Sequence, residues 1–304
     1  MNNLTIITEF LLMDISTSWE FQIFQGILFL LIYVGALAGN FLTITVIVMD
    51  RRLHLPMFFF IANLSLIDFG YISVTVPKAI INSITGRKWI SLPACVTQTF
   101  LFIFFGFTEF FFLVVMSYDR YVAICHPLHY KLTVTPHLCM QAAGGSWGSG
   151  LVYSAVHTWT IYRLPFTQSN VIHQYFCDVP QVMSLSSQAV QFSEFVVLAV
   201  STCIVSLCSV ILVISYVNIF SSVLLMCSSE ARNKALSTCS PQIATFVLFV
   251  FSSLFACLSP VSHASTIQTL LIAMFYTMVP PFINPIIFSM RNSEIKSALV
   301  FFLQ

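Results

Sequence analysis

Charged side chains are scarce in this chain of 304 residues. Asp, Glu, Lys and Arg make up 8% of it, whereas a typical soluble domain carries about 25%. The 12 basic and 11 acidic residues cannot coat a globule of this size with solvated charge, and a net charge of +1 creates no field that would attract phosphate. The composition therefore excludes a soluble enzyme, a disordered chain and a nucleic-acid-binding protein.

Apolar residues take the place of charge, and Phe alone occurs 31 times. Six long stretches contain no charged residue, or only Asp68 or Glu109: residues 21–49, 53–77, 89–118, 132–162, 195–229 and 235–290. A membrane span needs about 20 apolar residues, and the last stretch is long enough for two spans separated at Pro260. The sequence therefore predicts seven membrane-spanning helices, near residues 24–48, 57–79, 95–121, 137–160, 195–220, 235–258 and 267–289.

The basic residues predict the orientation of the spans, because cytoplasmic loops carry an excess of Lys and Arg. With the N-terminus outside, the inner segments hold Arg51, Arg52, Arg120, Lys131, Arg232, Lys234, Arg291 and Lys296. The outer segments then hold only Lys78, Arg87, Lys88 and Arg163. We expect an extracellular segment over 1–23, a membrane domain over 24–290 and a cytoplasmic tail over 291–304.

The first 20 residues contain no Lys or Arg, which argues against a cleavable signal peptide. We expect the first span to act as an uncleaved anchor. Asn3-Leu4-Thr5 is a glycosylation sequon on the predicted outer side. Glycosylation at Asn3 is therefore predicted.

The inner end of the third span carries Tyr118-Asp119-Arg120-Tyr121-Val122-Ala123-Ile124-Cys125-His126-Pro127-Leu128-His129-Tyr130. An Arg beside an Asp at a membrane boundary can form an ion pair whose partner is exchangeable. The alternative for an isolated pair is an Arg that extends to the membrane surface.

Further strings lie on other spans: Gly39-Asn40, Leu55-Pro56-Met57-Phe58-Phe59-Phe60, Leu64-Ser65-Leu66-Ile67-Asp68, Ser215-Tyr216, Lys234-Ala235-Leu236-Ser237-Thr238-Cys239 and Pro280-Pro281-Phe282-Ile283-Asn284-Pro285. Together with the third-span string, they resemble the mammalian-type olfactory receptors, which are rhodopsin-like (class A) G-protein-coupled receptors. The resemblance covers nearly the whole chain. It implies an all-α, seven-helix bundle in the plasma membrane that binds odorants and activates a stimulatory olfactory-type G protein, raising cyclic AMP.

The resemblance also implies an odorant site in the outer half of the bundle. The matching positions are Thr99, Phe102, Ile103, Gly106, Phe107, Ser201, Ile204, Val205, Ser253, Leu254, Cys257 and Thr277. They are mostly apolar with a few hydroxyls and no charge, which favours a small, neutral, hydrophobic odorant. The alternative for any single position is packing of helix against helix.

The resemblance assigns coupling to the G protein and switching to a second set: Asp119, Arg120, Tyr121, Tyr130, Tyr216, Lys234, Asn284 and Pro285. Two departures from the family pattern bear on activation. Phe288 replaces a Tyr at the end of the last span, and Val250 replaces a Tyr in the sixth. Gln242 stands where the family often has His.

Cys95 and Cys177 are the cysteine pair on the oxidising side of the membrane, and the resemblance supports a disulfide between them. Olfactory receptors usually add a second bridge in the same loop. The matching positions are Thr167 and Ser187, so we expect a single disulfide.

Asp68 and Glu109 are carboxyl groups near the middle of the membrane, where charge is costly unless it is paired or solvated. By resemblance, they line a polar cavity with Asn40 and Asn284 that could hold Na⁺ or a proton. The alternative is a protonated structural acid.

Such acids also occur in proton-coupled carriers, so a small transporter or channel is the rival function. The chain lacks the repeats and interrupted helices of such carriers. An intramembrane enzyme is weaker still, and we expect no catalytic residue and no cofactor other than this ion.

Overall fold

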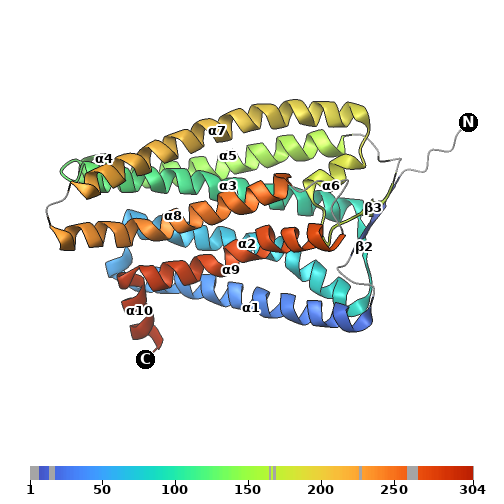
Figure 1. Cartoon of the computed structure of the whole chain (residues 1–304), viewed down its shortest axis with the longest axis horizontal. Coiled ribbons are helices and arrows are strands. Elements are labelled where there is room, and N and C mark those ends of the chain that lie inside the picture. The colour runs from blue at the N-terminus through green and yellow to red at the C-terminus, as the bar shows by residue number, and fades with distance from the viewer. Residues whose placement is uncertain are drawn as a thin grey trace, which may run out of the picture.

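The computed structural model describes residues 7–13, 18–163, 166, 169–225, 228–258 and 266–303, with backbone only at some positions, chiefly 252–258. Seven helices of 26 to 37 residues form a bundle in this part of the chain (Figure 1). They are α1 (Trp19–Met49), α2 (Pro56–Thr85), α3 (Leu92–Cys125), α5 (Pro136–Tyr162), α7 (Gln188–Leu224), α8 (Ser229–Leu258) and α9 (Thr266–Arg291). Each of the seven predicted spans lies within one of these helices, which confirms the predicted fold class.

Five segments of these helices are long and apolar enough to cross a membrane: Trp19–Met49, Pro56–Thr85, Leu92–Cys125, Val190–Leu224 and Leu271–Met290. Ala235–Phe251 of α8 is a shorter apolar helix. The sequence of α5 is less apolar because it contains several Gly, Ser and Thr residues.

The third helix occupies the middle of the bundle, since α3 packs on α2, α5, α7 and α8. The last long helix, α9, packs on α1, α2 and α8. Close approach of α3 and α5 depends on Gly150, where a Cβ would meet the Thr108 hydroxyl and the Phe104 carbonyl. Small residues at helix interfaces allow this kind of backbone approach in membranes.

A small sheet covers one end of the bundle. It comprises β1 (Glu9–Leu12), β2 (Trp89–Ser91) and β3 (Val171–Ile172) in the order β2-β1-β3. β1 pairs antiparallel with β2, placing Glu9 opposite Ser91, and parallel with β3, placing Leu11 opposite Val171. Phe10 and Leu12 alternate onto the buried face, as strand periodicity requires. The sequence did not predict this sheet.

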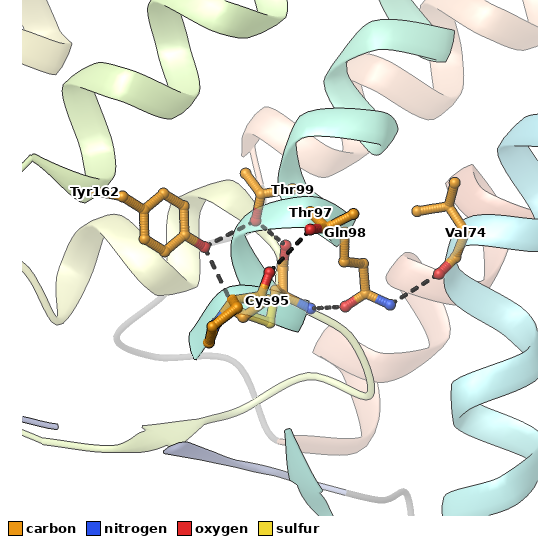
Figure 2. The surroundings of a disulfide bond; sticks show 8 residues. Val74, Cys95, Thr97, Gln98, Thr99 and Tyr162 are labelled. Atoms are coloured by element: carbon orange, nitrogen blue, oxygen red, sulfur yellow. Dashed lines mark hydrogen bonds between the residues drawn. A yellow bond between two sulfur atoms is a disulfide. The ribbon is translucent and has the colours of Figure 1, made fainter. Parts of the chain in front are cut away.

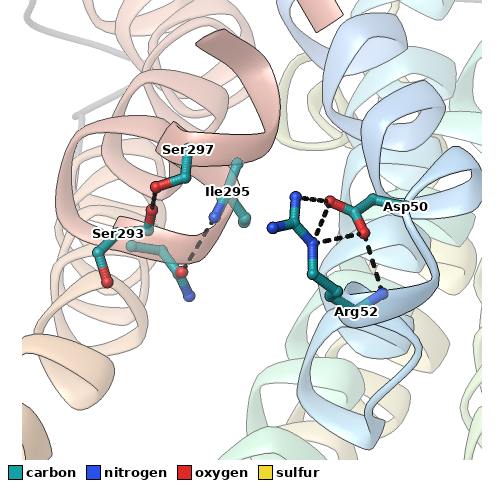
Figure 3. A network of polar contacts seen from close by, with 6 residues as sticks. Asp50, Arg52, Ser293, Ile295 and Ser297 are labelled. Atoms are coloured by element: carbon teal, nitrogen blue, oxygen red, sulfur yellow. Dashed lines mark hydrogen bonds and ion pairs between the residues drawn. The ribbon is translucent and has the colours of Figure 1, made fainter. Parts of the chain in front are cut away.

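Short helical segments complete the connections: η1 (Arg51–Leu53), α4 (Tyr130–Thr133), α6 (Val179–Ser184) and α10 (Ser293–Leu303). β2, β3 and α6 lie at one end of the bundle, and α4 and α10 lie at the other (Figure 1). The α10 helix begins where Asn292 accepts hydrogen bonds from the backbone amides of Glu294 and Ile295, at 3.0 and 3.3 Å. It lies beside the turn after α1, where Arg52 and Asp50 form an exposed ion pair of 2.7 Å (Figure 3).

Candidate functional site

The predicted disulfide between Cys95 and Cys177 is present, with Cα atoms 5.6 Å apart. It joins the first turn of α3 to the segment between α5 and α7, and we call this the disulfide end of the bundle. The Cys177 amide donates to Gln98, at 2.9 Å, and the Gln98 amide donates to the Val74 carbonyl of α2, also at 2.9 Å (Figure 2). The connecting segment is therefore held by both a covalent bond and a chain of hydrogen bonds. Thr167 lies outside the described residues, and Ser187 immediately precedes α7.

Two aromatic residues just before Cys177 enter the bundle as a plug, which we define as Tyr175 and Phe176. Both are fully buried. The Phe176 ring lies 5.2 Å from Phe102 of α3, and the Tyr175 hydroxyl contacts Thr277 of α9. The connecting segment thus fills the disulfide end of the bundle.

Three residues predicted for the odorant site contact the plug or the adjacent Cys177: Thr99, Phe102 and Thr277. Thr99 donates to the Cys177 carbonyl, at 3.3 Å, and lies 2.9 Å from the Tyr162 hydroxyl. The Phe102 ring packs 5.0 Å from Tyr71 and 6.2 Å from Tyr276. We call this aromatic region the chamber.

The remaining predicted odorant residues occupy different places. Ile103, Gly106 and Val205 are half-buried, and Ser253, Leu254 and Cys257 lie on the part of α8 whose side chains are not described. The structure brings Phe107, Ser201 and Ile204 together instead in a groove between α3, α5 and α7. Sequence reasoning missed Tyr71, Tyr175, Phe176 and Tyr276, although Tyr175 and Phe176 directly precede the bridging Cys177.

Asp178 follows the disulfide and is buried with the plug, at 8% exposure. Burial raises its pKa to about 6, and the nearby Tyr276 hydroxyl and Val179 backbone amide offset part of the rise. This carboxyl group therefore titrates closer to neutral pH than an ordinary Asp does.

The side chains predicted to line a polar cavity are buried in the interior, on α1, α2, α3 and α9. The Asn284 amide donates to Asp68, at 2.9 Å, and the Asn40 amide donates to the Pro281 carbonyl, at 2.8 Å. One oxygen of each of five buried side chains has no hydrogen-bond partner: Asp68, Glu109, Asn40, Asn284 and Ser65. Carboxylate, amide and hydroxyl oxygens are the ligands that hard cations prefer. This donor set therefore fits a small cation, although no cluster of three or more His, Cys, Asp or Glu exists among the described residues.

At the opposite end, Arg120 is paired with Asp119, and its Nε donates to the carboxylate at 2.9 Å. Tyr130 of α4 donates to the other oxygen of Asp119, at 2.8 Å. Burial, together with this contact, raises the pKa of Tyr130. We call this the Arg120 end of the bundle.

Apolar side chains close the space between α3, α7 and α8 at the Arg120 end. Ile219, Val223 and Cys239 form a buried cluster here, against which Tyr121 and Tyr216 pack. The Tyr216 hydroxyl donates to Gln242, at 3.5 Å. Predicted coupling residues of α3 and α7 therefore pack on the same cluster, while the Lys234 side chain of α8 lies outside the described part.

The structure shows where the two residues that depart from the family pattern lie. Phe288 is fully buried in the main apolar cluster and fills its site without a hydroxyl, and Val250 is half-buried on α8. Pro285 packs against α1, because a Cβ at Gly39 would lie 3.0 Å from its ring.

Comparison of the fold with solved structures gives the class of protein. The crystal structure of squid rhodopsin superposes with a TM-score of 0.69, at 17% identity, over 96% of this chain and 87% of that one. The chain therefore has the rhodopsin-like seven-helix fold.

Comparison of sequences gives the family. A family model described as "Olfactory receptor" matches residues 29–304. Olfactory receptor 14I1 from Homo sapiens is 51% identical over 100% of both chains, and olfactory receptor 14C36 from the same organism is 42% identical over 98% of this chain and 96% of its own. The chain belongs to the olfactory receptor family, a family of plasma-membrane, multi-pass receptors rather than enzymes.

Proposed function

We propose that this receptor binds small, neutral, hydrophobic odorants in the chamber and activates a stimulatory olfactory-type G protein, which raises cyclic AMP. One observation carries the proposal: α3 contributes a residue to the chamber, to the polar cavity and to the Arg120 end. It contributes Phe102 to the first, Glu109 to the second and Arg120 to the third. A small shift of this central helix would change all three sites together.

The disulfide end is extracellular in this proposal, and the Arg120 end is cytoplasmic. A disulfide persists in an oxidising compartment, which supports placing Cys95 and Cys177 outside. The excess of Lys and Arg in the opposite segments supports the same orientation. This orientation would also place Asn3, which lies outside the described residues, where glycosylation occurs.

The chamber would suit an apolar ligand, because it is built from the rings of Phe102, Phe176, Tyr71 and Tyr276. Burial against these rings would provide affinity, and hydroxyls such as Thr99 and Thr277 would orient one polar group of the odorant. An odorant that binds better to the active bundle would shift the population toward that state.

The polar cavity is proposed as a cation site. Asp68, Glu109, Asn40 and Asn284 would hold Na⁺ through the oxygens that lack hydrogen-bond partners. A bound Na⁺ would supply one positive charge, which offsets one of the two negative charges that Asp68 and Glu109 carry when both are ionised. The four side chains come from four helices, so they would favour the compact arrangement of α1, α2, α3 and α9.

Activation is proposed to separate the inner ends of α3, α7 and α8. The apolar cluster of Ile219, Val223 and Cys239 would open into a groove for a helix of the G protein. Arg120 would then exchange Asp119 for a partner on that helix, with Tyr216 beside it.

Replacing Arg120 by Ala tests this proposal. We expect odorant-evoked cyclic AMP to be abolished while surface expression stays normal, because the exchangeable cation is lost. Arg52→Ala is the matched control, since Arg52 also pairs with an Asp but is exposed and lies in the turn after α1. A full response from Arg120→Ala would contradict the assignment. Ion flux across vesicles without guanine-nucleotide exchange would favour the rival transporter.

A further inference from the structure

The groove between α3, α5 and α7 lies on the outside of the bundle and has a volume of about 780 Å³. Its two rims are valines: Val152 and Val156 of α5, and Val196 and Val200 of α7. All four are exposed, so the groove opens toward the membrane rather than into the chamber. Its volume lies within the range of small-molecule sites, about 300–1,000 Å³.

The α5 wall of the groove is flat. Gly145 and Gly148 line it, and a Cβ at either position would meet nothing within 4 Å. Next to them, the Tyr153 ring stacks on Phe107 of α3 with 3.3 Å between ring centroids and 12° between planes. A rigid, flat, apolar molecule matches this surface better than a branched one.

One polar edge interrupts the apolar lining, where His157 and Ser201 meet. His157 Nε2 lies 3.1 Å from Ser201 Oγ, and its Nδ1 contacts the buried Glu194 carboxylate. The Ser201 hydroxyl donates to the Val197 carbonyl, at 2.8 Å, so its oxygen is left to accept. Because His157 pairs with Glu194, the edge presents the Ser201 hydroxyl oxygen beside a paired histidine and carboxyl group. It would therefore suit a neutral ligand with one hydroxyl group.

The depth of this edge fits a membrane lipid with its hydroxyl near the surface. His157 lies five residues before the end of α5 at Tyr162, about 7.5 Å along the helix axis. The apolar wall continues from His157 to Gly145, about 18 Å further into the membrane. A ligand held here has its polar group near one membrane surface and its apolar body inside the hydrocarbon layer.

We propose that this groove binds a sterol of the surrounding membrane. The sterol hydroxyl donates to Ser201, and the ring system lies against the wall formed by Gly145, Gly148 and Tyr153. The site is separate from the odorant chamber, and the sterol bridges α3, α5 and α7 from the lipid side.

Photoaffinity labelling tests the proposal on the whole receptor in phosphatidylcholine nanodiscs containing a photoreactive sterol. We expect labelled peptides from α5 and α7, and competition by unlabelled cholesterol. Gly148→Phe should lower this labelling about tenfold, because the new ring occupies the groove. Gly144→Phe is the matched control: Gly144 is equally open on the same helix but does not line the groove, so labelling should persist.

The hydroxyl contact has its own readout. Cholesterol should compete about fivefold better than its methyl ether in the wild type, and Ser201→Ala should remove that preference. Thr202→Val is the control, because Thr202 is exposed on α7 and bonds only within its own helix. Val200→Trp fills the groove from the opposite rim and replaces Gly148→Phe if that variant fails to reach the membrane.

Three outcomes would overturn the proposal. The first is photolabel spread evenly over all membrane-facing helices. The second is photolabelling that neither groove-filling variant lowers. The third is an equal loss of photolabelling in Gly148→Phe and Gly144→Phe. The last would indicate that this face of α5 contacts a second copy of the receptor instead, since Gly144 and Gly148 form a Gly-x-x-x-Gly pattern.

Discussion

At the scale of single residues, Asp178 has the most unusual chemistry outside the membrane-spanning segments. It is buried behind the plug, and the titratable groups facing it are the hydroxyls of Tyr175, Tyr276 and Tyr71. None of these phenols carries positive charge, so none compensates for ionisation of the carboxyl group. The neutral form of Asp178 is therefore favoured when the plug is packed in the bundle, which we call the closed plug.

Acid should stabilise the closed plug. The folded-state pKa of Asp178, about 6, lies above its ordinary value of 3.8, so stability falls as pH rises between these values. The difference corresponds to about 3 kcal/mol at neutral pH. We expect hydrogen exchange in residues 171–184, corrected for intrinsic rates, to be slower at pH 5 than at pH 7.5.

Asp178→Asn should make exchange in this segment independent of pH over that range, because the amide does not ionise. Glu9→Gln serves as the control, since Glu9 is an exposed acid at the same end of the bundle. If Asp178→Asn kept the wild-type pH dependence, another group would control the plug.

At the scale of elements, the glycines of α5 divide into two classes by what surrounds them. Gly150 faces α3 closely enough that a Cβ would meet Thr108, whereas the surroundings of Gly144 are open. The same residue type therefore serves packing at one position and leaves open space at another.

Gly150→Val should destabilise the receptor by about 1–3 kcal/mol, because the added side chain forces α3 and α5 apart. A lower melting temperature in detergent, by several degrees, would report this loss. Gly144→Val should change it little. Equal melting temperatures for the two variants would show that α3 and α5 do not pack closely at Gly150.

The helices could be predicted from the sequence, because the membrane requires about 20 consecutive apolar residues and charges are excluded from them. The sheet could not be predicted: β1 has four residues, and its partners at Trp89–Ser91 and Val171–Ile172 are distant in the sequence. The groove between α3, α5 and α7 was also beyond the sequence. Family positions predict Phe107, Ser201 and Ile204 for the odorant site, and the structure shows that all three line this groove.

The polar residues were easier to predict than the apolar ones. Asp68, Glu109, Asn40 and Asn284 stand out in apolar spans, and their cost in lipid requires that they meet a partner or a cavity. Aromatic residues such as Tyr71 and Tyr276 carry no comparable signal, because aromatic side chains occur throughout the spans. The chamber lining therefore emerges only from the packing.

At the scale of the whole molecule, the polar cavity lies between the chamber and the Arg120 end. Asn284 of α9 holds Asp68 of α2 there by a single hydrogen bond, and both side chains are fully buried. This bond therefore joins α2 and α9, and both helices extend toward the disulfide end and toward the Arg120 end (Figure 1).

Asn284→Leu should uncouple odorant binding from cyclic AMP production. Removing the donor leaves Asp68 unpaired in the membrane interior, at a cost of roughly 1–3 kcal/mol, so the response should fall at least about tenfold. Asn63→Leu makes the same chemical change away from the cavity, at a side chain that bonds Trp147. Unchanged signalling by Asn284→Leu at normal surface expression would count against the cavity as a switch.

The sheet at the disulfide end also affects how the receptor is made. β1 is synthesised first, yet its partners are Trp89–Ser91 and Val171–Ile172. Chain elongation at about 5–20 residues per second separates β1 from β3 by roughly 10 to 30 seconds. During that interval several helices have entered the membrane while Phe10 and Leu12 have no core to join. The residues of β1 are therefore among the first to leave the ribosome. They are among the last in the N-terminal half of the chain to reach their folded position.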